Sequence, residues 1–290
     1  MTKLRDRRSF RRPWTNVAFT LLALLPVSPL HAAPCDLAGD ELHAVAGVID
    51  GDTLLLDDGR EVRLTGIQAP KLPLGRSGFE PWPLSEEARK AADALVEGKS
   101  VTLRYGGAQI DRHGRVLAQV FTNGEEGALW IQQEMLRKGL ARVYTFQDNK
   151  ACSDELLAAE REARNAGRGI WAHPFYDVRN GADAPSLEQL AGRFEVVEGT
   201  VKSAALVRGR IYVNFGDDYR QDFTVTVAPS DAKLFLADER WMPPPASNDD
   251  EGLSPLTGQK LRVRGWIDRH NGPEITATHP EQIEFLGSGN

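Results

Sequence analysis

Two short segments of the chain gather charged and polar residues in a pattern that suits chemistry on a phosphate. Residues 49–53 read IDGDT, with Asp50 and Asp52 on either side of a glycine, and residues 62–71 read VRLTGIQAPK. Carboxylates are oxygen ligands that hard cations prefer, and the guanidinium fork of Arg63 suits phosphate oxygens. The second segment ends with an amide at Gln68 and an ammonium at Lys71.

These segments resemble the active-site signature of the staphylococcal nuclease (thermonuclease) family, written DGDT and then VRLxGIDAPE. Further family motifs follow in the same order, so that the resemblance covers about residues 42–172. They are the hairpin 111–115 (DRHGR), the segment 138–143 (KGLARV) and the segment 167–171 (GRGIW). The resemblance implies a five-stranded OB-type barrel with flanking helices that hydrolyses phosphodiester bonds in DNA or RNA with calcium.

The resemblance also implies roles for single residues. Asp52 matches the first calcium ligand, and Asp50 matches its supporting neighbour. Arg63 and Arg115 match the two arginines that clamp the phosphate and neutralise charge in the transition state. Tyr144 lies near the position where the family contacts a nucleotide, although a Tyr after an apolar run also suits packing.

Two residues depart from the family pattern. Gln68 stands where the family has its second carboxylate ligand, and Lys71 stands where it has the catalytic glutamate that positions water. The pocket is therefore three charge units more positive than the pattern, which predicts that calcium is not held there. Three interpretations stay open. Arg63, Lys71 and Arg115 form a metal-independent anion pocket, Lys71 pairs internally with Asp52 in place of the cation, or these charges are merely solvated.

The first 33 residues have the features of a signal peptide. A basic stretch precedes an apolar run over residues 17–30, which is shorter than the roughly 20 residues of a membrane span. We therefore expect export to the periplasm or the medium, by the general or the twin-arginine route. Without these residues the chain has 29 basic and 40 acidic side chains, a net charge of −11, which is unfavourable for nonspecific binding of polyanions.

The chain contains two cysteines, Cys35 and Cys152. An even number of cysteines in an exported protein predicts a disulfide. This bond would join the start of the mature chain to the beginning of a helix.

Periodicity and turn residues divide the chain into two domains. Residues 42–173 contain strands and three helices, and we expect Ser85 and Ser153 to cap two of these helices. The helix between those two is predicted over residues 128–138. Residues 176–187 read as a polar linker, and residues 192–287 contain five strands and a short helix in an OB-like order. The predicted fold class is mainly β with α, an α+β protein with two OB-like barrels.

The function most in keeping with these patterns is a non-catalytic module that binds a nucleotide, a nucleic acid or an envelope partner. One alternative is a weak calcium-dependent nuclease, and a second is a protein-interaction module that binds no nucleic acid. No cofactor is expected, except calcium if the nuclease alternative holds. Histidine and cysteine spacings for zinc and glycine-rich phosphate loops are absent from the sequence.

Overall fold

The computed structural model describes residues 35–123, 127–241 and 253–288. The signal peptide predicted over residues 1–33 lies outside the described residues. Residues 33–290 group into one compact unit. Among the described residues, no helix is both long enough and apolar enough to cross a lipid bilayer.

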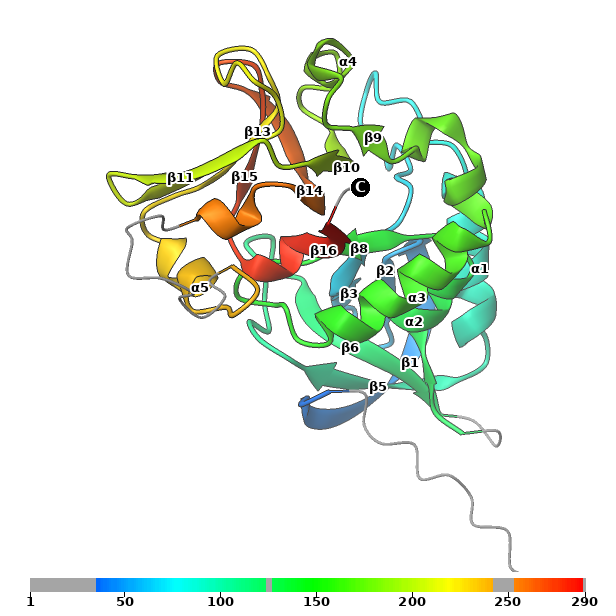
Figure 1. Cartoon of the computed structure of the whole chain (residues 1–290). Helices are drawn as coiled ribbons and strands as arrows, with labels where there is room; N and C mark the ends of the chain where they lie inside the picture. Colours follow the sequence, from blue (N-terminus) through cyan, green and yellow to red (C-terminus); the bar gives the residue numbers. More distant parts are fainter. Residues whose placement is uncertain (1–34, 124–126, 242–252, 289–290) are drawn as a thin grey trace, which may run out of the picture. The chain divides into compact units, whose positions relative to one another are not determined.

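A small closed barrel forms the N-terminal part of the fold (Figure 1). Its strands are β1 Ala38–Asp50, β2 Thr53–Leu56, β3 Glu61–Leu64, β5 Ser100–Tyr105 and β6 Val116–Asn123. The long β1 pairs antiparallel with β5 through its first half and with β2 through its second half. β2 pairs with β3, β3 runs parallel to β6, and β6 returns to β5, which closes the ring. This is the pairing expected of an OB-type barrel.

Side-chain alternation explains why these segments form a barrel. In β5, Val101, Leu103 and Tyr105 are buried and the residues between them are more exposed, the period of two that a half-buried strand requires. Three short strands complete this part of the chain, with β4 pairing with β8 and β7 extending the edge of β6. They are β4 Gly66–Gln68, β7 Leu129–Trp130 and β8 Arg142–Tyr144.

Three helices lie along one side of this barrel (Figure 1). They are α1 Ser85–Val96, α2 Ile131–Arg137 and α3 Ser153–Asn165. The capping prediction was wrong at both serines. Each is the first helical residue, and Leu84 and Cys152 hold the cap positions in the left-handed conformation. The middle helix begins later than predicted, because residues 129–130 pair with Phe121 and Thr122 of β6.

The predicted disulfide between Cys35 and Cys152 is confirmed, with the two Cα atoms 5.3 Å apart. It ties Cys35, three residues before β1, to Cys152 at the N-cap of α3 across a sequence separation of 117 residues. A loop of this length removes enough chain entropy from the unfolded state to stabilise the fold by about 4–5 kcal/mol.

Regular structure also occurs where a polar linker was expected. Two 3₁₀ turns, η1 Gly169–Ala172 and η2 Pro174–Tyr176, lead into β9 Arg179–Asn180 and the short helix α4 Ala184–Glu188. β9 adds parallel to a strand of the second barrel at Val197 and Glu198. Asp183 caps α4 by accepting a hydrogen bond from the backbone N–H of Ser186. The sequence prediction overlooked this cap because the whole segment is polar.

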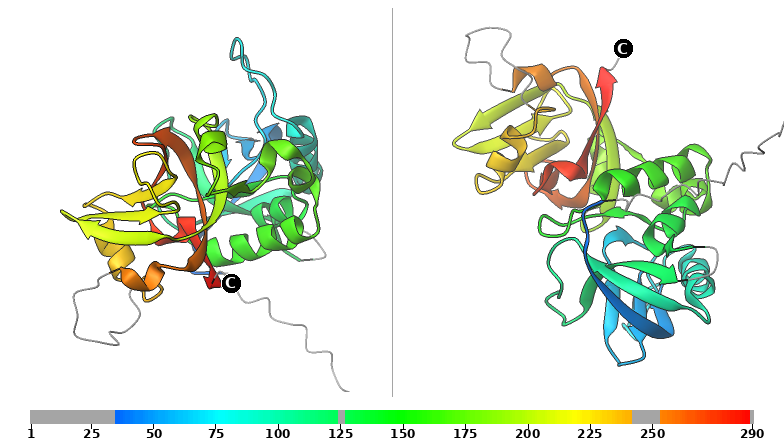
Figure 2. Two further views of the ribbon diagram at one scale, coloured as in Figure 1. Left: turned by 45° about the horizontal axis from the view of Figure 1, so that its top comes forward. Right: turned by 90° about the horizontal axis from the view of Figure 1, so that it is seen from below.

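The second barrel repeats the pairing of the first. Its elements are β10 Phe194–Thr200, β11 Ser203–Val207, β12 Arg210–Asn214, β13 Thr224–Val227, α5 Ala232–Leu236, η3 Ser254–Leu256, β14 Gln259–Arg269, β15 Pro273–Ala277, η4 Pro280–Gln282 and β16 Ile283–Ser288. β10 and β11 together take the place of β1, because β10 pairs with β14 and β11 pairs with β12. β13 runs parallel to β15, as β3 does to β6. Figure 2 shows these elements in colours that run from yellow-green through orange to red.

Each barrel has its own hydrophobic core. Leu54, Leu64 and Val120 are among the residues of the first, and Val213, Phe223 and Ile275 are among those of the second. The helices and the curled sheets confirm the predicted class of a mainly β, α+β protein with OB-like barrels.

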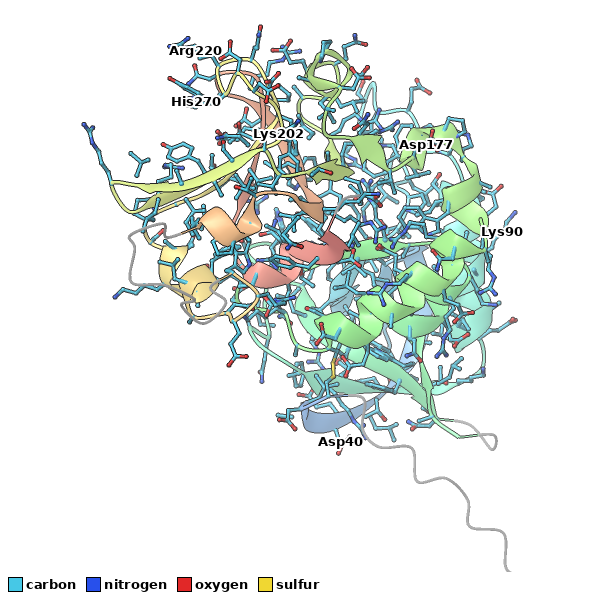
Figure 3. The ribbon with its side chains drawn as sticks, in the orientation of Figure 1. Asp40, Lys90, Asp177, Lys202, Arg220 and His270 are labelled. Atoms are coloured by element: carbon cyan, nitrogen blue, oxygen red, sulfur yellow. A yellow bond between two sulfur atoms is a disulfide. The ribbon has the colours of Figure 1, made fainter. Side chains whose placement is uncertain are left out.

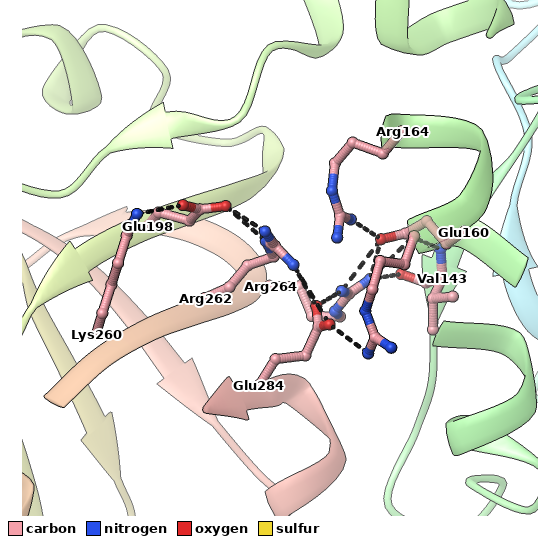
Figure 4. A network of polar contacts seen from close by, with 9 residues as sticks. Val143, Glu160, Arg164, Glu198, Lys260, Arg262, Arg264 and Glu284 are labelled. Atoms are coloured by element: carbon pink, nitrogen blue, oxygen red, sulfur yellow. Dashed lines mark hydrogen bonds and ion pairs between the residues drawn. The ribbon is translucent and has the colours of Figure 1, made fainter. Parts of the chain in front are cut away.

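A buried ionic network joins the two barrels (Figure 4). Arg264 of β14, only 1% exposed, donates to Glu160 of α3 at 3.0 Å and to Glu284 of β16 at 2.6 Å. Glu160 is fully buried and also accepts from the backbone N–H of Val143 and from Arg164. Nε of Arg264 and Nη2 of Arg164 have no partner among the described residues, but the other contacts pair the buried charges and restrict the position of the groups that carry them.

A buried histidine makes a second link and gives a pH-dependent stability. His279 is 1% exposed and its Nε2 lies 2.8 Å from Oγ1 of Thr145, which follows β8. Burial lowers the pKa of His279 from 6.5 to about 4. Because the folded state disfavours the imidazolium, the unfolded chain takes up the proton first as pH falls. We therefore expect about 2–3 kcal/mol of stability to be lost between pH 6.5 and pH 4.

Urea unfolding at several pH values tests this expectation against His279→Asn, which has an amide with no titration in that range. The stability of the variant should depend less on pH between 6.5 and 4 than that of the wild type. Identical slopes in the two proteins would contradict a neutral, buried His279.

Candidate functional site

The turn between β1 and β2 holds two buried aspartates. Asp50 is the last residue of β1 and is 3% exposed, and Asp52 is fully buried. Gly51 between them is required by space, because a Cβ there would lie 2.7 Å from the Cβ of Ala69 and 2.8 Å from that of Ala88. The backbone N–H of Asp52 donates to Oδ1 of Asp50 at 3.1 Å, which fixes the turn. Sequence alone already marked this turn.

The ammonium of Lys71 lies directly against these carboxylates. Nζ is 2.6 Å from Oδ1 and 2.7 Å from Oδ2 of Asp52, and 3.3 Å from Oδ2 of Asp50. The Lys71 side chain is 20% exposed, so the pair lies at the margin of the barrel core. Oδ2 of Asp52 also accepts the backbone N–H of Ala69 at 2.7 Å. Both oxygens of Asp52 therefore have strong donors.

Arg63 of β3 reaches the same aspartate from the other side. Its Nη1 lies 3.2 Å from Oδ1 of Asp52 and donates to the backbone carbonyls of Asp52 and Leu64. Its Nη2 donates to the carbonyl of Ile67 at 2.6 Å. The guanidinium, 11% exposed, is thus held by backbone oxygens of its own barrel.

The charges of this cluster shift the pKa values of the two aspartates in opposite directions. Burial opposes ionisation of Asp52, but Arg63 and Lys71 outweigh it and hold the pKa of Asp52 well below its usual value. Burial and the neighbouring charge of Asp52 raise the pKa of Asp50. The cluster therefore stabilises one firmly ionised carboxylate, that of Asp52, beside the ammonium and the guanidinium.

Gln68 makes its hydrogen bonds with Arg142 and not with the aspartate cluster. β4 and β8 pair Gln68 with Arg142, and Oε1 of Gln68 accepts from Nε and Nη2 of Arg142 at 3.1 and 2.9 Å. The Arg142 guanidinium is buried beside the rings of Phe194, Trp82 and Tyr176. Desolvation lowers the pKa of Arg142 to about 10. A neutral acceptor at residue 68 satisfies this guanidinium.

The other predicted residues make their contacts elsewhere. Arg115 pairs with Asp111 in its own hairpin, with Nε 2.8 Å from Oδ2, and within the described chain no hydrogen bond or ion pair joins it to Asp52. The hydroxyl of Tyr144 accepts from Nε1 of Trp266 in the second barrel at 3.1 Å, and its ring meets Phe194 edge to face. This geometry agrees with the packing interpretation of Tyr144.

Comparison with known proteins identifies the family of the chain from β3 to η1. Residues 61–173 match the family described as staphylococcal nuclease homologue. The thermonuclease of Staphylococcus hyicus is 26% identical over 148 residues, which are 50% of this chain and 84% of that protein. An uncharacterised protein of Bacillus anthracis is 33% identical over 142 residues, 47% of this chain and 64% of its own length. Residues 61–173 form a staphylococcal nuclease-type domain.

A probable staphylococcal-like nuclease of Oryza sativa is 32% identical to the chain over 111 residues, 38% of this chain. The match spans only 28% of the rice protein. The family match ends at residue 173, before the second barrel begins at β10. The family match therefore does not extend to the second barrel.

The donor set around Asp52 in the first barrel does not fit a calcium ion. Calcium takes six to eight oxygen ligands at about 2.3–2.6 Å, whereas the oxygens of Asp52 here contact an ammonium and a backbone N–H. Gln68, at the second ligand position, is committed to Arg142. Across the described ranges, no group of three or more His, Cys, Asp or Glu side chains is arranged to hold a metal.

Sequence reasoning missed Arg142 as the partner of Gln68. In the sequence Arg142 stands out only as part of the segment 138–143. Its guanidinium is buried against three aromatic rings, and one of these, that of Phe194, belongs to the second barrel. A signal was present in the sequence, since an arginine inside an apolar strand needs a buried acceptor. The register of β4 on β8 identifies that acceptor.

Proposed function

We propose that this protein is an exported, non-catalytic binding module in which the ammonium of Lys71 takes the structural place of a divalent cation. The observation that carries the proposal is the contact of Nζ with both oxygens of Asp52. The ammonium supplies the positive charge that a buried carboxylate needs in order to stay ionised. No cofactor is required for the fold of this site.

Hydrolysis needs an acceptor that positions and deprotonates water, and the position of the family's glutamate offers none. An ammonium has only donors while it is charged. The carboxylates that contact it, Asp50 and Asp52, are buried and already bonded. Arg63 is occupied by backbone carbonyls and Asp52, so it would have to break these bonds to clamp a phosphate. These contacts support a binding function over catalysis.

A nucleotide or short nucleic acid is the ligand class proposed for this domain, and the hairpin 111–115 is the surface that suits it. Arg112 and His113 are exposed there, and Arg115 remains 30% exposed although it is paired with Asp111. A guanidinium in this position can exchange a carboxylate partner for a phosphate oxygen. The acidic net charge of the chain predicts weak, salt-sensitive affinity.

The alternative with a specific observation behind it is a weak calcium-dependent nuclease, since the relative from Staphylococcus hyicus is named a thermonuclease. A role in protein interaction without nucleic acid is favoured by the net charge of −11 after export. An envelope protein would then be the partner.

A digestion assay on the mature, disulfide-bonded protein separates these functions. We expect plasmid DNA and RNA to stay intact both with calcium and with EGTA. Fluorescence anisotropy with a labelled oligonucleotide should show binding at low salt that weakens in Arg112→Ala/Arg115→Ala, but not in Lys233→Ala, an exposed lysine of the second barrel. Rapid cleavage that EGTA stops would establish the nuclease, and intact DNA with no binding at any salt concentration would favour the protein-interaction function.

A further inference from the structure

One outer face of the second barrel carries two adjoining cavities outside the nuclease-type domain. Their volumes are about 470 Å³ and 240 Å³, and both are lined by Tyr212, His270 and Glu274. Tyr212 belongs to β12 and Glu274 to β15, and His270 belongs to the loop between β14 and β15. The larger cavity is within the size range of small-molecule sites.

The floor of these cavities is a row of hydrogen-bonded polar side chains. Oε1 of Glu274 accepts from Oγ1 of Thr226 at 3.0 Å and from Oγ1 of Thr276 at 3.2 Å. Asn214 accepts from Oγ1 of Thr224 at 3.1 Å. Within the described residues, Oε2 of Glu274 accepts no hydrogen bond. The row therefore holds Glu274 in place and leaves an acceptor for a ligand.

Apolar and aromatic groups border the polar row. Tyr212 is half-buried, Tyr219 is 58% exposed, and Ala205 and Val207 lie on the same face of β11. The register of β11 on β12 places Ala205 opposite Tyr212. An apolar strip beside a row of fixed acceptors and donors suits a ligand that is itself amphipathic, with a flat apolar face and a polar edge.

Two loops in contact form one end of the face. Gly272 has φ of +93°, and a Cβ there would lie 2.6 Å from the carbonyl oxygen of Gln221. The loop between β14 and β15 therefore packs against the loop between β12 and β13. Figure 3 labels His270 and Arg220 close together at this end. The close approach explains why residue 272 is a glycine, and it restrains the two loops at this end of the site.

The charge of the face decides the class of ligand. Arg210 and Glu274 line the smaller cavity, and neither forms an ion pair with any described residue. Arg210 and Glu274 offset each other in charge and His270 is the one further basic side chain in the lining, so the face lacks the cluster of lysines and arginines from which affinity for nucleic acids comes. The carboxylate of Glu274, which has no ion-pair partner among the described residues, repels phosphates and can accept hydrogen bonds from hydroxyl groups through Oε2.

We propose that this face binds an uncharged oligosaccharide. A pyranose ring has an apolar face that stacks on Tyr212 or Tyr219 and hydroxyls that bond to Glu274, Asn214 and Arg210. β12 and β13 are the second and third strands of this barrel, and the corresponding face of OB folds takes oligosaccharides and oligonucleotides in general. The site is independent of the function proposed for the nuclease-type domain.

Calorimetric titration of the whole mature protein with cellohexaose, maltohexaose, chitohexaose and a dodecathymidylate tests the proposal. At least one of the sugars should bind saturably, and more tightly than the oligonucleotide at the same salt concentration. Tyr212→Ala and Glu274→Gln should each weaken sugar binding about tenfold, the loss expected when one stacking or charge-assisted contact is removed.

Leu206→Ala is the matched control, because Leu206 lies on β11 between Ala205 and Val207, points to the opposite side and is 48% exposed. It should leave the affinity unchanged. The proposal is overturned if no sugar binds, if the oligonucleotide binds more tightly, or if Glu274→Gln and Leu206→Ala have the same effect. If the Tyr212→Ala variant fails to fold, Glu274→Gln still tests the proposal, because its amide oxygen keeps an acceptor for Thr226.

Discussion

Lys71→Ala is expected to lower the free energy of unfolding by about 2–4 kcal/mol and to make the stability of the protein respond to calcium. The variant leaves Asp52 buried with Arg63 as its remaining charged partner, 3.2 Å away. Removing one partner of a buried pair costs more than the pair contributes, because an uncompensated charge stays behind. Added calcium should then take the place of Nζ against the oxygens of Asp52, which keep their contacts with Ala69 and Arg63, and restore about 1.4 kcal/mol at a tenfold excess over its dissociation constant.

Thermal unfolding with calcium and with EGTA measures both effects. Lys90→Ala is a suitable control, since Lys90 is an exposed lysine of α1 (Figure 3) and should change stability by less than about 0.5 kcal/mol with no calcium effect. A Lys71→Ala variant as stable as the wild type would show that the ammonium is not part of the fold. A calcium response of equal size in wild type and variant would show that the ammonium does not occupy the place of the cation.

Arg264→Leu is expected to destabilise the protein by about 3–5 kcal/mol and to uncouple the two barrels. Glu160 and Glu284 hold the pKa of Arg264 above its usual value against the effect of burial, so both carboxylates depend on this guanidinium. Without it, Glu160 of α3 keeps Arg164 but loses its link to the second barrel. The loss follows from leaving buried carboxylates short of a partner.

Urea unfolding followed by the fluorescence of the tryptophans in each barrel distinguishes one transition from two. We expect a single transition in the wild type and two separated transitions in Arg264→Leu. Arg161→Ala serves as the control, because Arg161 contacts Glu284 at 3.3 Å but is 52% exposed and should contribute less than about 1 kcal/mol. Equal effects of the two substitutions would contradict a central role for the buried guanidinium.

The sequence predicted the barrels where local pattern and burial agree. Alternating residues such as Val101 and Leu103 of β5 mark strands that face a single core. The helix starts were less predictable, because a serine is a common cap but Leu84 and Cys152 adopt the left-handed conformation instead. β9 and α4 were missed since their polar residues gain regular structure only by adding to β10 and by a cap from Asp183.

The residues of the candidate site were predictable from the sequence, but the partner of Gln68 was not. Position in the motif predicted that Asp52, Arg63 and Lys71 lie together, and the structure brings them into contact. Whether Gln68 faces that cluster or Arg142 depends on the register of β4 against β8, which no local pattern encodes. The contacts of Tyr144 and Glu160 with the second barrel likewise arise between residues more than 100 positions apart.

Calcium titration of the wild-type, disulfide-bonded protein by calorimetry decides whether the ammonium of Lys71 occupies the place of a cation. If the ammonium of Lys71 stands in the place of the cation, no saturable heat should appear even at millimolar calcium, and Lys71→Ala should show a binding isotherm that the wild type lacks. A wild-type dissociation constant in the micromolar range would mean that the ammonium leaves Asp52 to admit the ion, and that Lys71 does not replace the cation.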